Sequence, residues 1–444
     1  MSKKYSIYNT LLKVNDRFGL FYNAMSDKFI VLRSKAYEDL ANNDISQLKQ
    51  YNTALYNQLQ KVGGIVNVEL DEIQQVRNLI HDVDVDDTIY YLHVNPTVDC
   101  NFSCWYCYEN HEKGSKMSNE TCESVKKLID NIISQHENLN VFELAFFGGE
   151  PLMYFRHVVQ PLMQYLYNIC KEKKIATRFQ FTTNGYLLTS KMMDFFDGKD
   201  VGFQITLDGN REQHDKTRFP ANGHGSFDTI VDNIKQLALR GHDVIVRINF
   251  TAENITSVEG VCSCFETLPD EKRKHIRFDF QRVWQDEGKA PDENTLEETV
   301  LRYVCRLRED GFNASYIRFH DKVRCSCYGD KKNYLLVNYD GNVFNCIARD
   351  FVKENRSGYL CNDGTVVYDN CSYERRSRAK FSKHVCHECR IAPICGGGCA
   401  QKAIENMTTD KCLYGYTDKD IDDLILNRFD YSFAVKDNSK RNIN

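Results

Sequence analysis

The 444-residue sequence has no long hydrophobic run and no strong excess of charge of either sign. No window approaches the roughly 20 apolar residues that cross a bilayer. The first residues, MSKKYSIYNTLLKV, lack the apolar stretch of a secretory signal. A net charge of −5 is small for this length, which argues against the basic surface of a nucleic-acid-binding protein. We therefore expect a cytoplasmic protein with no nucleic-acid partner and no membrane partner.

Cysteine, by contrast, is abundant, with 18 residues in the chain. In a reducing compartment, cysteines seldom form a disulfide framework and more often hold metal. The chain is also too long for one ordinary hydrophobic core, and its 42% hydrophobic residues are ample for more than one. We expect two or three domains, at least one of which binds metal.

Three cysteines follow a predicted strand over residues 90–94, within the segment PTVDCNFSCWYCYEN. Cys100, Cys104 and Cys107 supply one thiolate fewer than the four that close a structural metal site, so one iron of a bound cubane would keep an open position. The same spacing would also place three small hydrophobic residues on one helix face. Pro96 disfavours continuation of the strand. The cysteines are therefore expected in a loop at the C-terminal end of a strand, where α/β folds carry their chemistry.

These cysteines, with the aromatic Tyr106 before the last of them, resemble the signature of radical S-adenosylmethionine (SAM) enzymes. The resemblance implies a [4Fe–4S] cluster whose free iron is chelated by the amino and carboxylate groups of SAM. It also implies an α/β fold with an open, partial (β/α)6 barrel. Residues 85–315 alternate strands and helices in this way, with further strands predicted over 142–147, 179–182, 202–207, 244–250 and 276–280.

Two glycines and several polar residues stand at or shortly after the ends of these predicted strands. Each of them could instead belong to an ordinary turn or to a structural ion pair. They are Gly148, Gly149, Glu150, Asn184, Thr206, Asp208 and Arg218. By resemblance, the Gly-Gly-Glu turn holds the amino group of SAM and Arg218 pairs with its carboxylate. The hydroxyl, amide and carboxylate of the other three suit a ribose or a carboxylate, which need both donors and acceptors.

The C-terminal part contains a second group of cysteines, and their C-x2-C pairs alone would suit zinc. They are Cys325, Cys327, Cys346, Cys386, Cys389, Cys395, Cys399 and Cys412. Their order resembles the SPASM extension of radical SAM peptide maturases, which implies two auxiliary [4Fe–4S] clusters and three in all. In that family the two sets interleave. The resemblance assigns the first cluster to Cys325, Cys327, Cys346 and Cys399, and the second to Cys386, Cys389, Cys395 and Cys412.

One detail departs from the family pattern, because Cys325 and Cys327 are more closely spaced than the family's first two ligands. Without Cys325, the first auxiliary cluster would keep an open iron that could bind substrate. The remaining cysteines fit no ligand spacing and are interpreted as core or surface thiols. They are Cys122, Cys170, Cys262, Cys264, Cys305, Cys361 and Cys371.

Residues 1–84 are predicted to form a small α+β, winged-helix-like domain. The pattern predicts a hairpin over 19–32, helices over 34–41 and 45–62, a wing at 65–68 and a helix from near Asp71. It resembles the recognition domains of enzymes that modify ribosomally made peptides, which bind a leader peptide as an added strand. A plain cap on the barrel is the alternative. Residues 316–430 would form the SPASM domain, and 431–444 a polar tail that is expected to fray.

Together, the resemblances imply a radical SAM/SPASM oxidoreductase that modifies a ribosomally synthesised precursor peptide. The leader would bind residues 1–84, and a reductant such as flavodoxin or ferredoxin would supply electrons. A 5′-deoxyadenosyl radical from SAM would remove a hydrogen atom from the peptide, giving a cross-linked (thioether, C–C or C–O) or otherwise oxidised residue. No catalytic base is assigned.

Two other functions stay open. An anaerobic sulfatase-maturating enzyme, which makes formylglycine, would carry an Asp where this chain has Ile347. A non-catalytic, metal-binding scaffold for peptides would hold zinc or iron without cleaving SAM.

Overall fold

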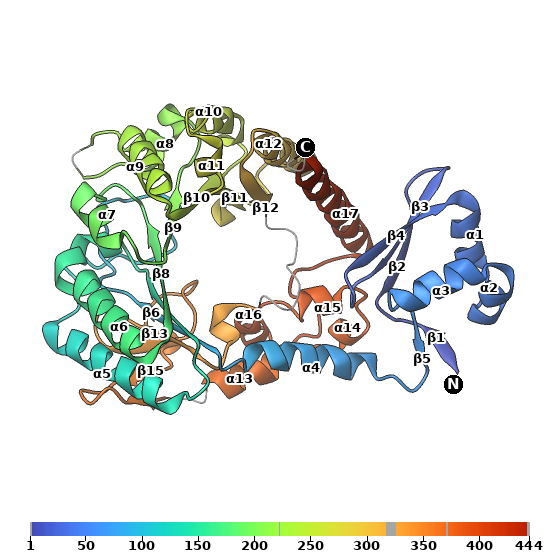
Figure 1. Cartoon of the computed structure of the whole chain (residues 1–444), viewed down its shortest axis with the longest axis horizontal. Helices are drawn as coiled ribbons and strands as arrows, with labels where there is room; N and C mark the ends of the chain where they lie inside the picture. Colours follow the sequence, from blue (N-terminus) through green and yellow to red (C-terminus); the bar gives the residue numbers. More distant parts are fainter. Residues whose placement is uncertain (1, 222, 317–325, 370–371, 442–444) are drawn as a thin grey trace. The chain divides into compact units, whose positions relative to one another are not determined.

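The computed structural model describes residues 2–221, 223–316, 326–369 and 372–441. The chain divides into two compact units (Figure 1). One comprises Met1–Asp86, Arg318–Lys332 and Tyr373–Asn444, and the other Asp87–Ile317 and Asn333–Ser372. Among the helices in the described ranges, none is long and apolar enough to cross a membrane.

Within the described residues, the larger unit is built on one open sheet of 11 strands in the order β12-β11-β10-β9-β8-β7-β6-β13-β14-β15-β16. Neighbouring strands from β12 to β13 run parallel, and those from β13 to β16 run antiparallel. The parallel strands are β6 (Ile89–Val94), β7 (Val141–Phe146), β8 (Ala176–Thr183), β9 (Val201–Thr206), β10 (Asp243–Phe250), β11 (Ile276–Arg282), β12 (Asn313–Tyr316) and β13 (Tyr334–Val337). The antiparallel extension adds β14 (Asn342–Phe344), β15 (Gly358–Leu360) and β16 (Val366–Tyr368).

Helices cover the outer side of the parallel strands (Figure 1). They are α5 (Asn119–Gln135), α6 (Gln160–Lys173), α7 (Ser190–Phe196), α8 (Arg211–Thr217), α9 (Phe227–Arg240), α10 (Glu259–Ser263), α11 (Asp270–Arg273) and α12 (Glu293–Glu309). Because helices shield them, the central strands are apolar along most of their length, as in β9, where Phe203 and Ile205 are fully buried.

The predicted partial barrel is confirmed, since all six predicted strands are present and the described sheet does not close on itself. The structure also shows a strand pairing that the sequence did not predict, between β13 and β6. Leu336 lies beside His93 although more than 240 positions separate them in the sequence. Every residue of β13 is buried, as expected for a strand that lies between β6 and β14 in the sheet.

The smaller unit contains a three-stranded antiparallel sheet, β2-β3-β4, and a two-stranded pair, β1-β5. Its elements are β1 (Lys3–Tyr5), β2 (Asn9–Lys13), β3 (Phe18–Asn23), β4 (Lys28–Arg33), α1 (Ser34–Asn42), α2 (Ile45–Tyr51), α3 (Thr53–Lys61), β5 (Ile65–Asn67) and α4 (Glu72–Asp84). The predicted hairpin is confirmed. The single helix predicted over 45–62 is wrong, because Asn52 has a non-helical backbone and its side chain accepts from Leu55 N, which begins a new helix.

The later part of the chain completes this unit. It contributes α13 (Ser372–Ala379), α14 (His384–His387), α15 (Ala392–Cys395), α16 (Ala400–Glu405) and α17 (Asp418–Arg441). The segment expected to fray from residue 431 instead continues α17 to Arg441. Ile421 and Ile425 anchor the start of this helix in a core. Extending an anchored helix into polar sequence costs little compared with starting one.

The β2-β3-β4 sheet contributes residues to a hydrophobic core on each of its faces, since successive strand residues point to opposite sides. On one face, Phe21 and Ile30 pack with the helices α1 to α3. On the other face, Leu20 and Tyr22 pack with Ile391 and with residues of α17. Residues from the two ends of the chain thus share one hydrophobic core.

Candidate active site and auxiliary cysteine site

The first three cysteines lie in an irregular loop after β6, at the C-terminal edge of the parallel sheet. This geometry excludes the alternative of an apolar helix face. Cys100 is buried, whereas Cys104 and Cys107 are partly buried. The base of the loop is fixed by Asp99, whose carboxylate accepts from Lys113 Nζ at 2.9 Å and from Gly114 N at 2.8 Å. Burial raises the pKa of the Cys100 thiol to about 12, so this thiol is neutral when nothing is bound to it.

The Gly-Gly-Glu turn after β7 packs directly against the cysteine loop. Gly148 and Gly149 both have positive φ, +81° and +47°. A Cβ at Gly148 would stand 2.8 Å from Thr97 O, and one at Gly149 would overlap the Asp99 carbonyl oxygen. Glycine is therefore required at both positions so that the turn can approach the backbone of the cysteine loop.

Glu150 ties this turn to the end of β8. Its carboxylate accepts from Thr183 Oγ1 at 2.7 Å, from Asn184 N at 2.7 Å and from Leu152 N at 3.0 Å. The side chain is fully buried, and burial raises its pKa in spite of these donors. The Asn184 side chain in turn donates to Asn101 Oδ1 at 2.8 Å and lies 4.0 Å from Cys100 Sγ. Both residues thus support the cysteine loop.

Tyr106 connects the loop to the strand ends on the other side. Its hydroxyl donates to Asp208 Oδ2 and accepts from Arg218 Nη1 at 2.8 Å and from Asn249 Nδ2 at 3.3 Å. Arg218 Nη1 lies 4.0 Å from Asp208 Oδ2. Burial raises the pKa of Tyr106 well above its ordinary value and also raises that of Asp208. Sequence reasoning missed Asn249, because only the strand order brings it here.

Arg218 is positioned by α8 and by a buried histidine. The Arg218 carbonyl accepts from Ser226 Oγ at 2.6 Å, and that hydroxyl lies 3.0 Å from His214 Nε2. Burial and the nearby Arg218 guanidinium hold the pKa of His214 well below its ordinary range. The predicted Thr206 lies half-buried at the end of β9.

Four buried polar atoms around the loop have no hydrogen-bond partner among the described residues. They are Asn101 Nδ2, Glu109 Oε1, Asp208 Oδ1 and Arg218 Nε. Buried donors and acceptors are normally paired. This mixture of donors and acceptors suits a small zwitterionic ligand such as the methionine portion of SAM. The residues therefore fit the implied cofactor.

Glu109 was not identified from the sequence. Its Oε2 accepts from Gly149 N at 3.2 Å, which places the carboxylate between the cysteine loop and the Gly-Gly-Glu turn. Burial raises its pKa to about 7. The sequence feature that could have identified Glu109 is its position two residues after Cys107.

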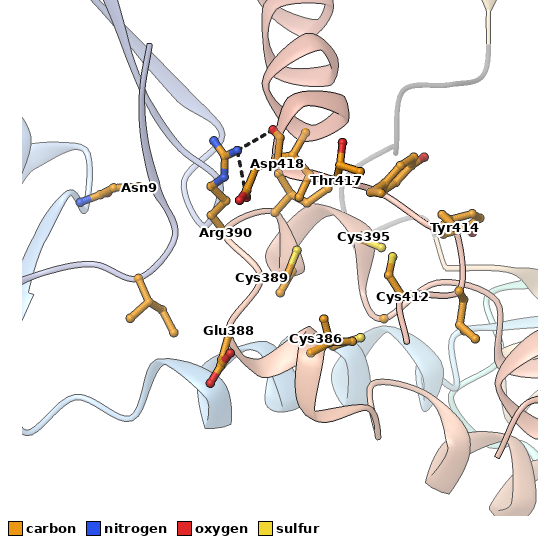
Figure 2. Close-up of a pocket in the computed structure, with 18 residues that line it drawn as sticks. Asn9, Cys386, Glu388, Cys389, Arg390, Cys395, Cys412, Tyr414, Thr417 and Asp418 are labelled. Carbon is orange, nitrogen blue, oxygen red and sulfur yellow. Dashed lines mark hydrogen bonds and ion pairs between the residues drawn. The ribbon is translucent and has the colours of Figure 1, made fainter. Parts of the chain in front are cut away.

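The smaller unit contains a cavity of about 600 Å³ lined by Cys386, Cys389, Cys395 and Cys412. Figure 2 shows these four side chains around the same space, together with Arg390 and Tyr414. Burial and the neighbouring thiols raise the pKa of Cys386 to about 11 and that of Cys395 to about 12. The structure thus brings together the four cysteines assigned to the second auxiliary cluster.

Within the described residues, no group of three or more His, Cys, Asp or Glu side chains converges on a single metal-ion position. A cubane cluster needs no such convergence, because each thiolate ligates a different iron.

The first auxiliary set is placed only in part. Cys325 lies outside the described residues. Cys327 and Cys399 are both electrostatic neighbours of Tyr414, so these two thiols lie in one region of the smaller unit. Cys346 belongs to the larger unit, where it is an electrostatic neighbour of Tyr108 together with Cys107.

Comparison with known proteins also identifies a radical SAM domain in this chain. Residues 94–262 match the family described as the radical SAM superfamily. The chain is 29% identical over 235 residues to Fe-coproporphyrin III synthase of Methanosarcina barkeri, covering 50% of this chain and 53% of that protein. It is 27% identical over 342 residues to the serine-type anaerobic sulfatase-maturating enzyme of Bacteroides thetaiotaomicron, covering 68% and 80%. The first curated relatives are matched over only 37% to 53% of their lengths.

Among solved structures, the chain is similar to Streptococcus suis SuiB bound to the precursor peptide SuiA. The TM-score is 0.52 at 16% sequence identity, covering 91% of this chain and 97% of that chain. The family match confirms the predicted radical SAM domain, and the structural likeness confirms the predicted fold.

Proposed function

The chain carries a radical SAM domain, and from this premise we propose that it is a radical SAM/SPASM oxidoreductase that modifies a ribosomally synthesised precursor peptide. The observation that carries the proposal is the cysteine loop at the C-terminal edge of the sheet. It is held on one side by the Gly-Gly-Glu turn and on the other by Tyr106, and unpartnered buried polar atoms lie around it.

Cys100, Cys104 and Cys107 would hold a [4Fe–4S] cluster. With SAM bound, this cluster supplies reductive cleavage of a sulfonium to a carbon radical that can remove hydrogen atoms. The chain's own residues position the cofactor and exclude water. Glu109 offers an acceptor, Arg218 Nε and Asn101 Nδ2 offer donors, and Asp208 Oδ1 a further acceptor. Two auxiliary [4Fe–4S] clusters would occupy the two C-terminal cysteine sets, and flavodoxin or ferredoxin would be the reductant.

We assign leader-peptide recognition to residues 1–84, with 85–315 as the radical domain and 316–430 as the auxiliary domain. Three observations support the recognition role. The β2-β3-β4 sheet ends at β4, whose one strand neighbour among the described residues is β3. The exposed side chains of β4 are Lys28, Val31 and Arg33. An edge strand can accept an extended peptide by backbone hydrogen bonding. SuiB, which shares the fold, has also been solved with a bound precursor peptide.

The activity is tested by anaerobic co-expression with a small reading frame encoded next to this chain, followed by mass spectrometry of its product. Loss of hydrogen in pairs would indicate cross-linking or oxidation, and 5′-deoxyadenosine release under reduction would confirm SAM cleavage. An unmodified peptide without 5′-deoxyadenosine would overturn the proposal. A hydrazide probe separates the sulfatase-maturating alternative, since formylglycine is an aldehyde and a cross-link is not. Zinc without SAM cleavage would favour the scaffold.

Recognition is tested by Val31→Asp, because this side chain is 51% exposed on the edge strand and its replacement should leave the fold intact. We expect the affinity for the peptide to fall about tenfold, because the bound peptide would bury the new carboxylate without a partner. SAM cleavage should be unchanged. Val14→Asp is the matched control, since Val14 is 50% exposed and lies outside β4. Deleting residues 1–84 is a poorer test, because it would also remove part of the core shared with the cysteine segment.

A further inference from the structure

The auxiliary cysteine cavity and the β2-β3-β4 sheet are parts of one folded body. Leu20 and Tyr22 of β3 are 1% and 0% exposed, and they share a core with Ile391 and Ile394, which lie between Cys389 and Cys395. If the cysteine segment lost its fold, these apolar side chains would meet water. The order of the sheet therefore depends on the order of the cysteine segment.

A single side chain adds a polar connection between the two. Arg390 directly follows Cys389, and its Nη1 donates to Thr10 Oγ1 of β2 at 3.3 Å and to Asp422 Oδ1 at 2.6 Å. Its Nη2 donates to the Asp418 carbonyl at 2.8 Å (Figure 2). Thr10 is only 4% exposed, so the β2 end of this bridge is buried. Arg390 thereby joins the sheet to α17 beside a cysteine ligand.

The sheet also reaches the cavity itself. Ile7 and Asn9 line the same space as the four cysteines. Asn9 is held in place by the N-terminal part, since its Nδ2 donates to Gly64 O at 2.7 Å and its Oδ1 accepts from Asn23 Nδ2 at 2.9 Å. Because Asn9 is the first residue of β2, a change in the shape of the cavity alters the contacts of this strand.

The cysteine segment has little local structure of its own. The helices α14 and α15, which carry Cys386 and Cys395, are four residues long each. Helices this short are not stable in isolation, because the first turn is costly to form. A metal centre held by the four thiolates would supply the missing constraint, as in other small domains whose folding is coupled to metal binding.

We propose that loading of the centre at Cys386, Cys389, Cys395 and Cys412 orders the β2-β3-β4 sheet, so that the sheet can recognise a peptide only in the loaded protein. The recognition half of this statement rests on the proposed function, whereas the ordering half does not.

The ordering is tested by hydrogen exchange on the full chain after reconstitution with iron and sulfide. We compare the wild type with the double variant Cys389→Ser/Cys412→Ser, and use Cys305→Ser as control because Cys305 is exposed. Residues 9–33 should exchange at least about tenfold faster in the double variant, while β7 to β9 keep their protection. Equal protection of residues 9–33 in both proteins would overturn the proposal.

A second variant keeps all the ligands. Arg390→Gln removes the bridge to Thr10 and should loosen residues 9–33 at full iron content, whereas Arg356→Gln, which removes an ion pair to Asp369 in the other unit, should not. If the double variant loses protection throughout the chain, the wild type before and after reconstitution decides, and equal protection of residues 9–33 in the two states would overturn the proposal. Full iron content with unchanged protection of residues 9–33 in Arg390→Gln would refute the role given to the bridge.

Peptide binding separates this inference from the proposed function. The probe is the precursor peptide encoded next to this chain. Failure of the loaded wild type to bind it would remove the recognition role, while the exchange data would still decide the ordering. Equal affinity for the loaded wild type and the unloaded double variant would overturn the link between the centre and recognition.

Discussion

Arg218 Nη1 donates to the Tyr106 hydroxyl at 2.8 Å, and this bond joins the cysteine loop to the segment that follows α8. The same hydroxyl donates to the buried Asp208. A neutral phenol thus separates a buried cation from a buried anion that lie 4.0 Å apart. The hydroxyl is therefore a hydrogen-bond partner of both charged groups.

Tyr106→Phe should therefore leave both charges short of a partner. We expect the free energy of unfolding to fall by about 1–3 kcal/mol, the usual cost of an unsatisfied buried polar group. SAM affinity should fall as well, because Asp208 and Arg218 would shift toward each other. Chemical denaturation and SAM titration check this. Tyr51→Phe is the control, since Tyr51 is 71% exposed, and equal behaviour of the two variants would contradict the role given to Tyr106.

Gly149→Ala should displace the turn from the cysteine loop, because the added Cβ would overlap the Asp99 carbonyl oxygen. Gly114→Ala is a matched control, since Gly114 also has a positive φ, +77°, but its added methyl group would have no atom within 4 Å. Both variants share the backbone strain of roughly 1 kcal/mol. Only Gly149→Ala should also lose iron at the first cluster. Iron analysis and denaturation distinguish the two, and equal iron content would refute the packing argument.

Glu109→Gln should weaken SAM binding while leaving the fold intact. The amide oxygen can still accept from Gly149 N, but the negative charge and the unpartnered carboxylate oxygen are gone. We expect about a tenfold loss of affinity, typical of one charge-assisted hydrogen bond. Isothermal titration of the reconstituted protein measures it, with Glu123→Gln as a surface control. Unchanged affinity would remove Glu109 from the site.

Iron content should follow the three proposed clusters. The reconstituted wild type should hold about 12 iron atoms per chain, and the variant Cys100→Ala/Cys104→Ala/Cys107→Ala about four fewer. Cys305→Ala should lose none, because that thiol is exposed and outside every proposed set. Zinc in place of iron would contradict the assignment.

His93 should make stability depend on pH. Burial lowers its pKa to about 4 in the folded protein, below the ordinary value of about 6.5. As pH falls through this window, the unfolded chain takes up the proton first, so stability is present above pH 6.5 and is lost toward pH 4. The wild type should lose about 2–3 kcal/mol more than His93→Gln over this range. Urea denaturation at several pH values measures the difference, and a wild type that parallels its variant would refute it. His384→Gln is the exposed control.

The sequence by itself determined the order of the strands and the motifs at their ends. Strands buried under helices must be apolar, and the loops that follow them must be polar, so β6 to β11 and the cysteine loop could be located from pattern. The hairpin of β3 and β4 could likewise be predicted, because its strands and turn are adjacent in the sequence. Asn52 was missed because an N-cap inside a helical pattern changes no hydrophobic period.

The tertiary structure decided how distant segments meet. It placed Glu150 on Thr183, Tyr106 on Asp208 and Asn249, and Arg390 on Thr10, contacts that join positions up to 380 residues apart. It also placed β13 beside β6 and gave the N-terminal sheet a second buried face made by the cysteine segment. Side-chain pattern specifies which face of an element is apolar. Which partner covers that face is settled only when all the elements pack together, because many partners of similar hydrophobicity compete for it.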